Sequence, residues 1–499
     1  MPPTPARPAT SRGAPSRRVM SRRVPSRPVP SRLAPVDEAN LVLDHDGQVN
    51  VFLVAALLAP GGVVASDGTV DLAVLRAVLR ERVAAIPQLR IVPVPTGRRH
   101  RWAEVTPDLQ HHVREAGRVE GWAGLERLCG ELMCAPLDRG RPLWEVLLVP
   151  GASPGQAVAV LRIHHAIADG MAAVGIVHEL FDPPAPATEA VTATEAATAE
   201  GSRSAAEGGP AAEGGPAAEG GPAADPVRPA EASGTGGTAA ARGRDPWHVL
   251  GRIRFGLYRL RKTLLARGVG PTVLLGERGP HRGVVFLNAD LAALEACGRS
   301  SGATVNDVLL AAVASGYRAA LAAAGEALPA WLPVSVPVSL ARHGSSANQV
   351  GVMLVHLPLG EDGPAVRLRL ITGQTRREKA RARDQGTLEL MRGPLGARIM
   401  DRVARRQHLV AGFVTNVPGP SRELGLAGAP VTAVWPVAVL AANVRLGVAA
   451  VSYAGRLCCG VHFDADRVPG TAFARALDAA LTPPEKRSSE RRIGLPPVD

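Results

Sequence analysis

Residues 158–170 read VAVLRIHHAIADG, and this stretch decides how the rest of the chain is interpreted. Its first six residues, five of them apolar, predict a short buried strand. Apolar residues at helical spacing follow it, at Val174, Val177 and Phe181. The segment therefore predicts a strand, a polar loop and a helix in succession, and α/β proteins place reacting groups at such junctions.

The loop of this junction carries two adjacent histidines, His164 and His165, followed by Asp169 and Gly170. A neutral imidazole at this place can act as a general base near pH 7, a role worth roughly 10²- to 10⁴-fold in rate. In that interpretation Asp169 orients the loop by pairing with an arginine, and Gly170 permits the turn into the helix. The residues alone leave a second interpretation open, in which two polar loop residues precede a helix that Asp169 caps.

Other catalytic motifs lack the context that their chemistry needs. Residues 151–155 fit the letters of a Gly-x-Ser-x-Gly elbow, but Pro154 has no N–H for an oxyanion hole and a predicted strand follows. The sequence holds no zinc-binding His-Glu-x-x-His, no phosphate loop ending in Gly-Lys and no Gly-x-Gly-x-x-Gly after a strand. A second histidine pair, His111-His112, precedes no Asp-Gly and is expected on the surface.

Composition divides the 499 residues into two folded halves and three segments expected to be disordered. Gly (54 residues) and Pro (44 residues) concentrate in a few stretches, one of which repeats Ala-Ala-Glu-Gly-Gly-Pro over 205–222. The predicted organisation is an Arg/Ser/Pro tail at 1–35, a first half at 36–184, a linker at 185–247, a second half at 248–483 and a tail at 484–499.

Strands and helices alternate in both halves, which predicts an α/β fold with mixed sheets. Helices are expected at 70–83, 291–297 and 305–321. Strands are expected at 144–149, 158–163, 283–287, 332–338, 350–357, 433–442, 449–453 and 457–463, the last two as a hairpin around Ala454-Gly455.

Charge and hydropathy limit the environment of the protein. The formal net charge is +12, mostly from arginine, but only 3% of the residues are aromatic and there is no basic recognition motif, so nucleic acid is not an expected partner. No apolar run reaches the roughly 18–20 residues of a membrane span, and no secretory signal is recognised. The five cysteines form no Cys-x-x-Cys and are expected as reduced, buried, cytosolic thiols. Residues 247–272 predict a basic amphipathic helix, which either lies on an anionic membrane or packs on its own domain.

The motif His-His-x-x-x-Asp-Gly at 164–170 resembles the signature of the CoA-dependent acyltransferase superfamily. Further stretches, in the same order, resemble landmarks of bacterial wax ester synthase/diacylglycerol acyltransferases. They lie at 34–37, 87–90, 137–145, 304–311, 333–339, 348–351, 415–420 and 452–455. The resemblance covers about 36–482 and is interrupted by the linker.

This resemblance implies two chloramphenicol-acetyltransferase-like halves with an active-site tunnel at their interface. His165 matches the catalytic base, while His164, Asp169 and Gly170 match motif positions with supporting roles. Asn306 and Asp307 match a second motif near the active site, although the residues themselves equally predict a helix N-terminus capped there. No metal and no cofactor are implied, since acyl-CoA is a co-substrate.

The function implied is acyl-CoA-dependent O-acyl transfer to diacylglycerol, which makes triacylglycerol, with long-chain alcohols as second acceptors that give wax esters. The expected partners are fatty acyl-CoA and one of these acceptors. The expected location is the cytoplasm, free or attached peripherally to the inner membrane face or to lipid droplets. Two alternatives stay open: an acyltransferase for a specialised metabolite or a carrier-bound acyl group, and a non-catalytic lipid-binding paralogue.

Overall fold

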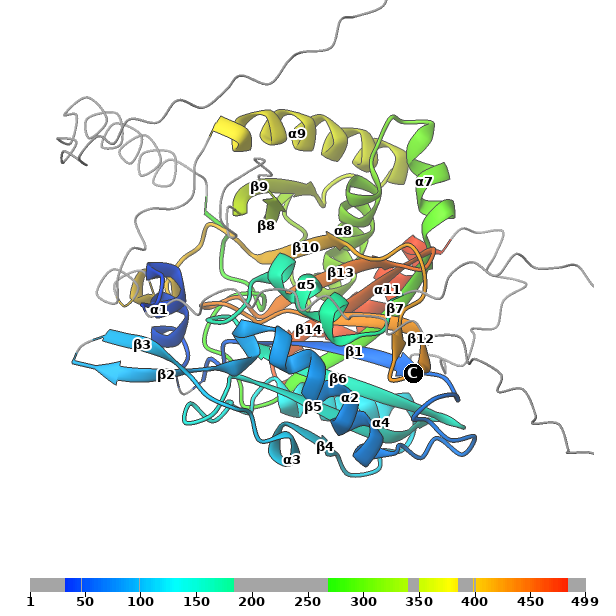
Figure 1. The fold of residues 1–499 in the computed structure, drawn as a ribbon. Helices are drawn as coiled ribbons and strands as arrows, with labels where there is room; N and C mark the ends of the chain where they lie inside the picture. The colour runs from blue at the N-terminus through cyan, green and yellow to red at the C-terminus, as the bar shows by residue number, and fades with distance from the viewer. Residues whose placement is uncertain are drawn as a thin grey trace, which may run out of the picture. The chain divides into compact units, whose positions relative to one another are not determined.

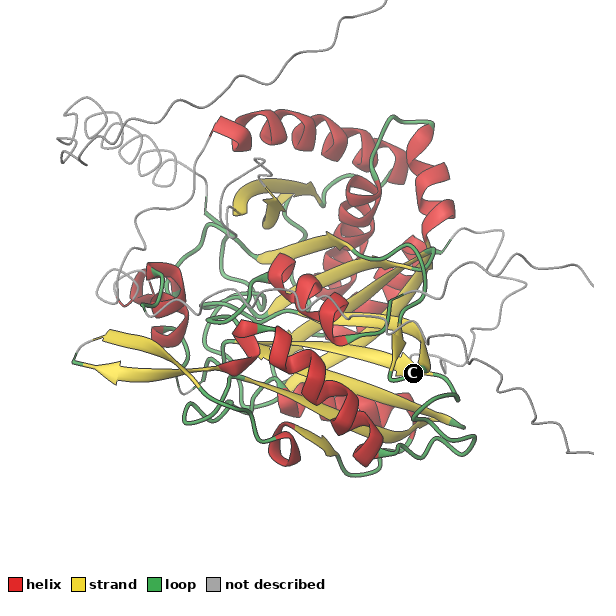
Figure 2. Ribbon diagram, viewed as in Figure 1, coloured by secondary structure: helices red, strands yellow, loops and turns green. Residues whose placement is uncertain are grey.

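Two six-stranded mixed sheets carry the fold in the computed structural model (Figures 1 and 2). The model describes residues 32–45, 47–97, 99–183, 268–339, 350–384, 398 and 401–482. The predicted linker at 185–247, the C-terminal tail and nearly all of the predicted basic helix lie outside these residues, as does the N-terminal tail up to residue 31. The alternation of strands and helices confirms the predicted α/β class.

The first sheet has the order β11-β12-β1-β6-β5-β4, and the second has the order β7-β14-β13-β10-β8-β9. The strands of the first sheet are β1 (Val51–Leu58), β4 (Val113–Glu115), β5 (Trp144–Ser153), β6 (Gln156–His164), β11 (Gly425–Leu426) and β12 (Ala429–Val437). Those of the second are β7 (Arg282–Asp290), β8 (Trp331–Ser339), β9 (Val350–Pro358), β10 (Gly412–Pro418), β13 (Leu446–Tyr453) and β14 (Arg456–Asp464). A separate ribbon pairs β2 (Ile91–Thr96) with β3 (Arg99–Glu104).

Four strands of each sheet repeat one pattern. In the first sheet β1, β6 and β5 are antiparallel neighbours and β4 runs parallel to β5. In the second sheet β7, β14 and β13 are antiparallel neighbours and β10 runs parallel to β13. In each set the hairpin, β5–β6 or β13–β14, is followed by a helix that begins at a glycine, Gly170 or Gly470. This repetition confirms the two-half architecture.

Helices flank both sheets (Figure 2). They are α1 (Pro35–Val42), α2 (Leu72–Ala85), α3 (Leu109–His112), α4 (Gly121–Leu132), α5 (Gly170–Leu180), α7 (Leu291–Arg299), α8 (Val305–Ala323), α9 (Pro364–Asp384) and α11 (Gly470–Leu481), with a 3₁₀ turn at Pro87–Arg90. The helix α1 begins at Pro35, and Arg32 already forms a β-bridge with Arg101, so residues 32–35 of the predicted N-terminal tail have defined contacts or structure.

The two halves are joined by strand exchange and by close backbone contact. Strand β12, which follows the second-half strand β10 in the sequence, leaves the second sheet and pairs antiparallel with β1 in the first. At the junction between α4 and β7, a Cβ added at Gly130 would lie 2.2 Å from the carbonyl oxygen of Arg282, so only glycine fits. These contacts hold the motif-bearing sheet against the second half.

Successive side chains of β7 enter two different hydrophobic cores, as the pleat of a strand requires. Val284 and Phe286 belong to the core that surrounds the first sheet, whereas Val285 and Leu287 belong to the core of the second half. One face of the second sheet therefore packs against the first half at the interface between the halves.

Three details differ from the sequence-based expectations. The strands β5 and β6 extend beyond the expected 144–149 and 158–163 and meet at a tight turn at Pro154-Gly155. The buried residues of α5 are Ala173, Ile176 and Leu180; of the expected apolar positions Val174, Val177 and Phe181, only Phe181 is buried. Cys297 is exposed and Cys134 is partly exposed, so only three of the five cysteines are buried.

Candidate active site

His165 lies immediately after β6 and is held by its backbone on both sides. Its N–H donates to the carbonyl oxygen of Asn50 at 3.0 Å, and its own carbonyl oxygen accepts from Nδ2 of Asn40 at 3.0 Å. The same Asn50 donates from Nδ2 to the backbone oxygen of Asn40 at 2.9 Å. Two asparagines from α1 and from the segment before β1 thus fix the position of the predicted base.

The His165 ring itself is left available. Its edge contacts Phe52, with ring centroids 5.1 Å apart, and its imidazole nitrogens form no hydrogen bond with the residues that the structure describes. Burial, with a contribution from neighbouring His164, lowers the pKa of His165 to about 4. The imidazole is therefore neutral at pH 7 and has a lone pair to accept a proton.

His164 is fully buried beneath it and has a different role. Its Nδ1 accepts the N–H of Ala166 at 2.9 Å, which places the ring proton on Nε2. That Nε2 lies 3.3 Å from Oδ2 of Asp44. His164 therefore shapes the turn that carries His165 and is not itself open to a substrate.

Asp44 links His164 to an arginine from a distant loop. Its Oδ1 accepts the N–H of Asn50 at 3.0 Å, and its Oδ2 accepts from Nη2 of Arg139 at 3.0 Å. Arg139 also donates to the carbonyl oxygen of Leu41. Burial alone would raise the pKa of Asp44, but His164, the Asn50 N–H and Arg139 lower it to about 2. The carboxylate is therefore charged throughout the physiological range.

Asp169 begins the helix that follows. Its side chain is the N-cap of α5 and accepts the N–H of Ala172 at 2.8 Å. Gly170 does not have a positive φ, and a Cβ there would meet only Val417 of β10, at 3.9 Å. The predicted conformational need for Gly170 is therefore wrong, and the glycine instead marks where the motif approaches the second sheet.

A second carboxyl group lies next to this helix start. Burial raises the pKa of Asp37 to about 6, and nearby Asp169 adds to that effect, whereas a backbone hydrogen bond at Ala34 opposes it. Asp37 is on α1, one turn before Asn40, which holds the His165 carbonyl. The face of α1 that supports His165 therefore also carries a carboxyl group that titrates close to neutrality.

Asn306 and Asp307 are at the start of α8. Asp307 completes a capping box with Thr304, since its Oδ2 accepts the Thr304 N–H at 2.8 Å. Its Oδ1 accepts the hydroxyl of Thr375 on α9 at 2.6 Å, and the side chain is 1% exposed. These contacts give Asp307 a structural role, and none of the contacts between described residues joins it or Asn306 to the two motif histidines.

A buried ion pair fixes the strands that carry the motif. Arg162 on β6 pairs with Glu145, its cross-strand neighbour on β5, and donates from Nη2 to the carbonyl oxygen of Leu132 at 2.7 Å. The neighbouring Trp144 donates from Nε1 to the carbonyl oxygen of Leu89 and stacks on His112. His112 is 1% exposed, so its predicted surface position is wrong.

Sequence reasoning missed Asn40, Asp44 and Asn50. The available signal was the polar stretch 44–50 directly before the apolar run that forms β1. Because β1 pairs antiparallel with β6 and Val51 faces His164, the residues that precede β1 come to lie beside the motif. Arg139 was noticed only as part of the landmark at 137–145.

Two further findings concern chemistry and environment. Within the described ranges, no group of three or more histidine, cysteine or acidic side chains is arranged to hold a metal ion. Among the helices of the same residues, none combines the length and the apolar character that crossing a bilayer requires.

The fold and the histidine junction define a class. Solved structures with the same fold include a wax ester synthase/diacylglycerol acyltransferase from Marinobacter aquaeolei VT8, at a TM-score of 0.62 and 20% identity, covering 90% of this chain and 98% of that one. The first condensation domain of the CDA synthetase matches at a TM-score of 0.54 and 16% identity, covering 91% and 94%. The chain therefore has the two-half fold that these solved structures share.

Sequence comparison gives the family. The wax ester synthase/diacylglycerol acyltransferase catalytic domain matches residues 33–309, and the C-terminal domain of the same family matches 346–482. The chain belongs to the wax ester synthase/diacylglycerol acyltransferase family. A relative from Mycobacterium tuberculosis, named "Probable diacyglycerol O-acyltransferase tgs1", is 29% identical over 387 residues, which are 74% of this chain and 77% of that one.

Proposed function

We propose that the protein is an acyl-CoA-dependent O-acyltransferase that esterifies diacylglycerol, with long-chain alcohols as second acceptors. The observation that carries the proposal is a neutral, unengaged imidazole at His165, positioned by backbone bonds to Asn40 and Asn50. The names of the relatives support diacylglycerol as the acceptor.

The proposed reaction is a direct transfer. His165 takes the proton of the acceptor hydroxyl while the hydroxyl oxygen attacks the thioester carbonyl carbon. The resulting tetrahedral oxyanion collapses, the carbon–sulfur bond breaks, and the CoA thiolate takes the proton back from the imidazolium. An ester and free CoA thiol are formed, and no acyl-enzyme is needed.

The supporting residues have separate tasks in this proposal. His164 and Asp44 hold the turn that carries His165, and Asp169 caps the N-terminus of α5. Since the low pKa of His165 keeps its ring uncharged, the base is available over a wide pH range. A weakly basic imidazole abstracts the proton only as the attack proceeds, which suits a concerted step.

An apolar approach to the site supports a lipid acceptor. Val36 is 50% exposed beside Asp37, and Met171 is 44% exposed beside Gly170. Exposed large apolar side chains next to a catalytic junction favour a hydrophobic substrate.

The test uses labelled palmitoyl-CoA with dioleoylglycerol or hexadecanol, and compares the wild type with His165→Ala. Labelled triacylglycerol or wax ester should form, and the substitution should lower kcat by about 10²- to 10⁴-fold. His111→Ala is the matched control, because it alters a histidine pair outside the motif and should retain activity. Release of free CoA without either ester, or full activity of His165→Ala, would contradict the proposal.

A further inference from the structure

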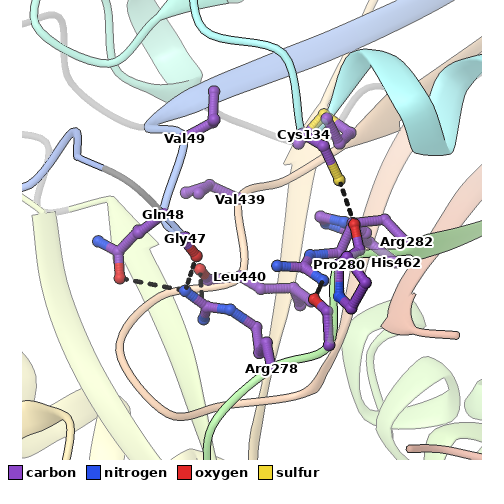
Figure 3. A pocket seen from close by; sticks show the side chains of 12 residues that line it. Gly47, Gln48, Val49, Cys134, Arg278, Pro280, Arg282, Val439, Leu440 and His462 are labelled. Carbon is purple, nitrogen blue, oxygen red and sulfur yellow. Dashed lines mark hydrogen bonds between the residues drawn. The ribbon is translucent and has the colours of Figure 1, made fainter. Parts of the chain in front are cut away.

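A cavity of about 400 Å³ lies between residues of the two halves (Figure 3). Gln48 and Val49 line it from the segment before β1, and Arg278, Arg282 and His462 line it from the second half. Its volume is within the range of small-molecule sites. Val49 directly precedes Asn50, whose carbonyl oxygen holds His165, so the cavity borders the support of the catalytic base.

Arg278 forms one side of this cavity, and no carboxylate of the described residues lies within ion-pair distance of it, although Asp464 and Asp401 act on it from further away. Its Nη1 donates to the carbonyl oxygens of Leu440 and Ala442 at 2.9 and 2.7 Å, and its Nη2 donates to the carbonyl oxygen of Gly47 at 3.1 Å. Neutral carbonyls satisfy hydrogen bonds but do not cancel the charge. Burial lowers the pKa of Arg278 to about 10, and Arg282 contributes to the lowering, so the cation persists at neutral pH.

Arg282, at the start of β7, has guanidinium N–H donors that make no hydrogen bond with the described residues. Its Nη1 donates to the carbonyl oxygens of Gly279 and His281, whereas its Nε and Nη2 form no hydrogen bond with the described residues. No carboxylate among those residues lies within ion-pair distance of Arg282. The nearby Asp464 is engaged elsewhere, since its Oδ2 accepts the Gly279 N–H at 2.9 Å and lies 3.7 Å from Nε of Arg445.

His462 adds an unsatisfied acceptor. Its Nδ1 is 2.7 Å from the carbonyl oxygen of Ala438, which places the proton on Nδ1. Its Nε2 is buried and has no hydrogen-bond partner among the described residues, while the residue as a whole is 2% exposed. Figure 3 shows His462 and Arg282 grouped on one side of the cavity, away from Gln48. A buried polar atom without a partner calls for an explanation, and at the wall of a cavity a bound group that donates to it is one.

We infer that this cavity binds the phosphate-bearing part of the acyl-CoA donor, with Arg282 and Arg278 facing a phosphate and His462 accepting from a hydroxyl or amide N–H of the same molecule. Two guanidiniums without carboxylates favour an anion, and Arg282 still has the forked donors that match phosphate oxygens. The inference rests on the proposed function for the identity of the donor.

The position of the cavity agrees with such a ligand. An acyl-CoA carries its phosphates at one end and its thioester at the other, so a phosphate site must lie beside the reacting centre and not in it. The cavity is next to the reacting centre in the chain, because Val49 lines it and the following residue, Asn50, accepts the His165 N–H. Apolar lining by Val439 and Leu440 leaves room for the uncharged part of the molecule.

The experiment compares two donors in steady-state kinetics: palmitoyl-CoA and S-palmitoyl-N-acetylcysteamine, which has the thioester but no phosphate. Arg282→Gln should lower the ratio of kcat/KM for palmitoyl-CoA to that for the truncated donor by about 10- to 100-fold, mainly through KM. Arg282→Lys keeps the positive charge but loses the paired guanidinium donors. Its ratio of kcat/KM values should therefore lie between those of the wild type and of Arg282→Gln.

Arg456→Gln is the matched control, because Arg456 is at the opposite end of the same strand pair and outside the cavity. It should leave the ratio unchanged. Calorimetric titration with CoA and with inorganic phosphate completes the test: CoA binding should weaken at least tenfold in Arg282→Gln. Phosphate that binds equally to both proteins would show that the anion site is elsewhere.

The outcomes distinguish failure of the cavity assignment from failure of the proposed acyltransferase function. Wild-type turnover of palmitoyl-CoA with an unchanged donor ratio in Arg282→Gln would overturn the cavity assignment and leave the proposed function standing. Absence of turnover and of CoA binding in the wild type would overturn both.

Discussion

Replacing Asp44 with asparagine keeps the size of the side chain but removes the negative charge that faces His164 and Arg139. In the folded protein the pKa of Asp44 is about 2, against an ordinary value of 3.8. This difference corresponds to about 2 kcal/mol of stabilisation at pH 7. The side chain is only 5% exposed, so solvent screening reduces this value little.

The pH dependence of this effect follows from its sign. A carboxyl group with a depressed folded-state pKa contributes its stability above the unfolded pKa and loses it as the pH falls through the folded pKa. The loss caused by Asp44→Asn should therefore be about 2 kcal/mol at pH 7 and about 1 kcal/mol at pH 3. Because the turn that carries His165 also loosens, kcat at pH 7 should fall by about 10- to 100-fold.

Urea unfolding at pH 7 and pH 3 measures the first quantity, and acyl transfer from palmitoyl-CoA measures the second. Asp138→Asn is a suitable control, since that carboxylate is 59% exposed and its contact with Arg141 is on the surface. It should change the free energy of unfolding by less than about 0.5 kcal/mol. An Asp44→Asn loss of equal size at both pH values would refute the charge argument.

Three other predictions follow from the same contacts. The acid limb of kcat/KM should bend near pH 4 instead of near 6.5, because His165 is active when neutral and protonates only below its lowered pKa; a bend near 6.5 would contradict this. Asp307→Asn should cost about 1–2 kcal/mol in urea unfolding and leave both KM values unchanged, since it breaks the capping box and the Thr375 bond; a 100-fold loss of kcat at wild-type stability would instead indicate a catalytic role. Glu145→Gln should cost about 3–5 kcal/mol in the same assay, because it leaves Arg162 buried without its partner; a loss under 1 kcal/mol would show that the pair contributes little.

Local sequence patterns predicted most of the helices and strands that are bounded by clear turn or capping residues. The helix expected at 70–83 is α2, and Leu75, Leu79 and Val83 are its buried residues. The hairpin around Ala454-Gly455 is also present, with both residues at positive φ. In such segments the apolar spacing and the turn residues depend only on near neighbours, so the sequence contains the information.

The sequence-based predictions were wrong where contacts between residues distant in the chain decide which side chains are buried. The helix α5 is apolar on several faces, so periodicity alone could not show that Ile176 and Leu180 would be the buried ones. His112 is buried because it stacks on Trp144, more than thirty residues away. The long helix α9 was missed because charged residues interrupt its apolar pattern, although Leu368 and Ile371 are buried.

Of the candidate site, only the histidine motif was predictable from the sequence, and the residues that hold it were not. His164, His165 and Asp169 lie within six residues and form a motif, whereas Asn50, Asp44 and Asn40, which hold the histidines, are 115 to 125 positions away in the chain. The pairing of β1 with β6 brings these partners to the histidines, and its register depends on the complete sheet.

The repeated halves explain why one base serves the proposed reaction. His164 ends β6, and His462 lies near the end of β14, which has the equivalent place in the second sheet. His164 is the last residue of β6 and His165 follows it, whereas the last residue of β14 is Asp464 and Ala465 follows it, so the second half has no base at that position. The two buried histidines also hold their protons on opposite nitrogens, Nε2 beside Asp44 in one half and Nδ1 beside the Ala438 carbonyl in the other. Because the proton of His462 is on Nδ1, its Nε2 can accept a hydrogen bond in the cavity, which is the role that the proposed donor site assigns to the second half.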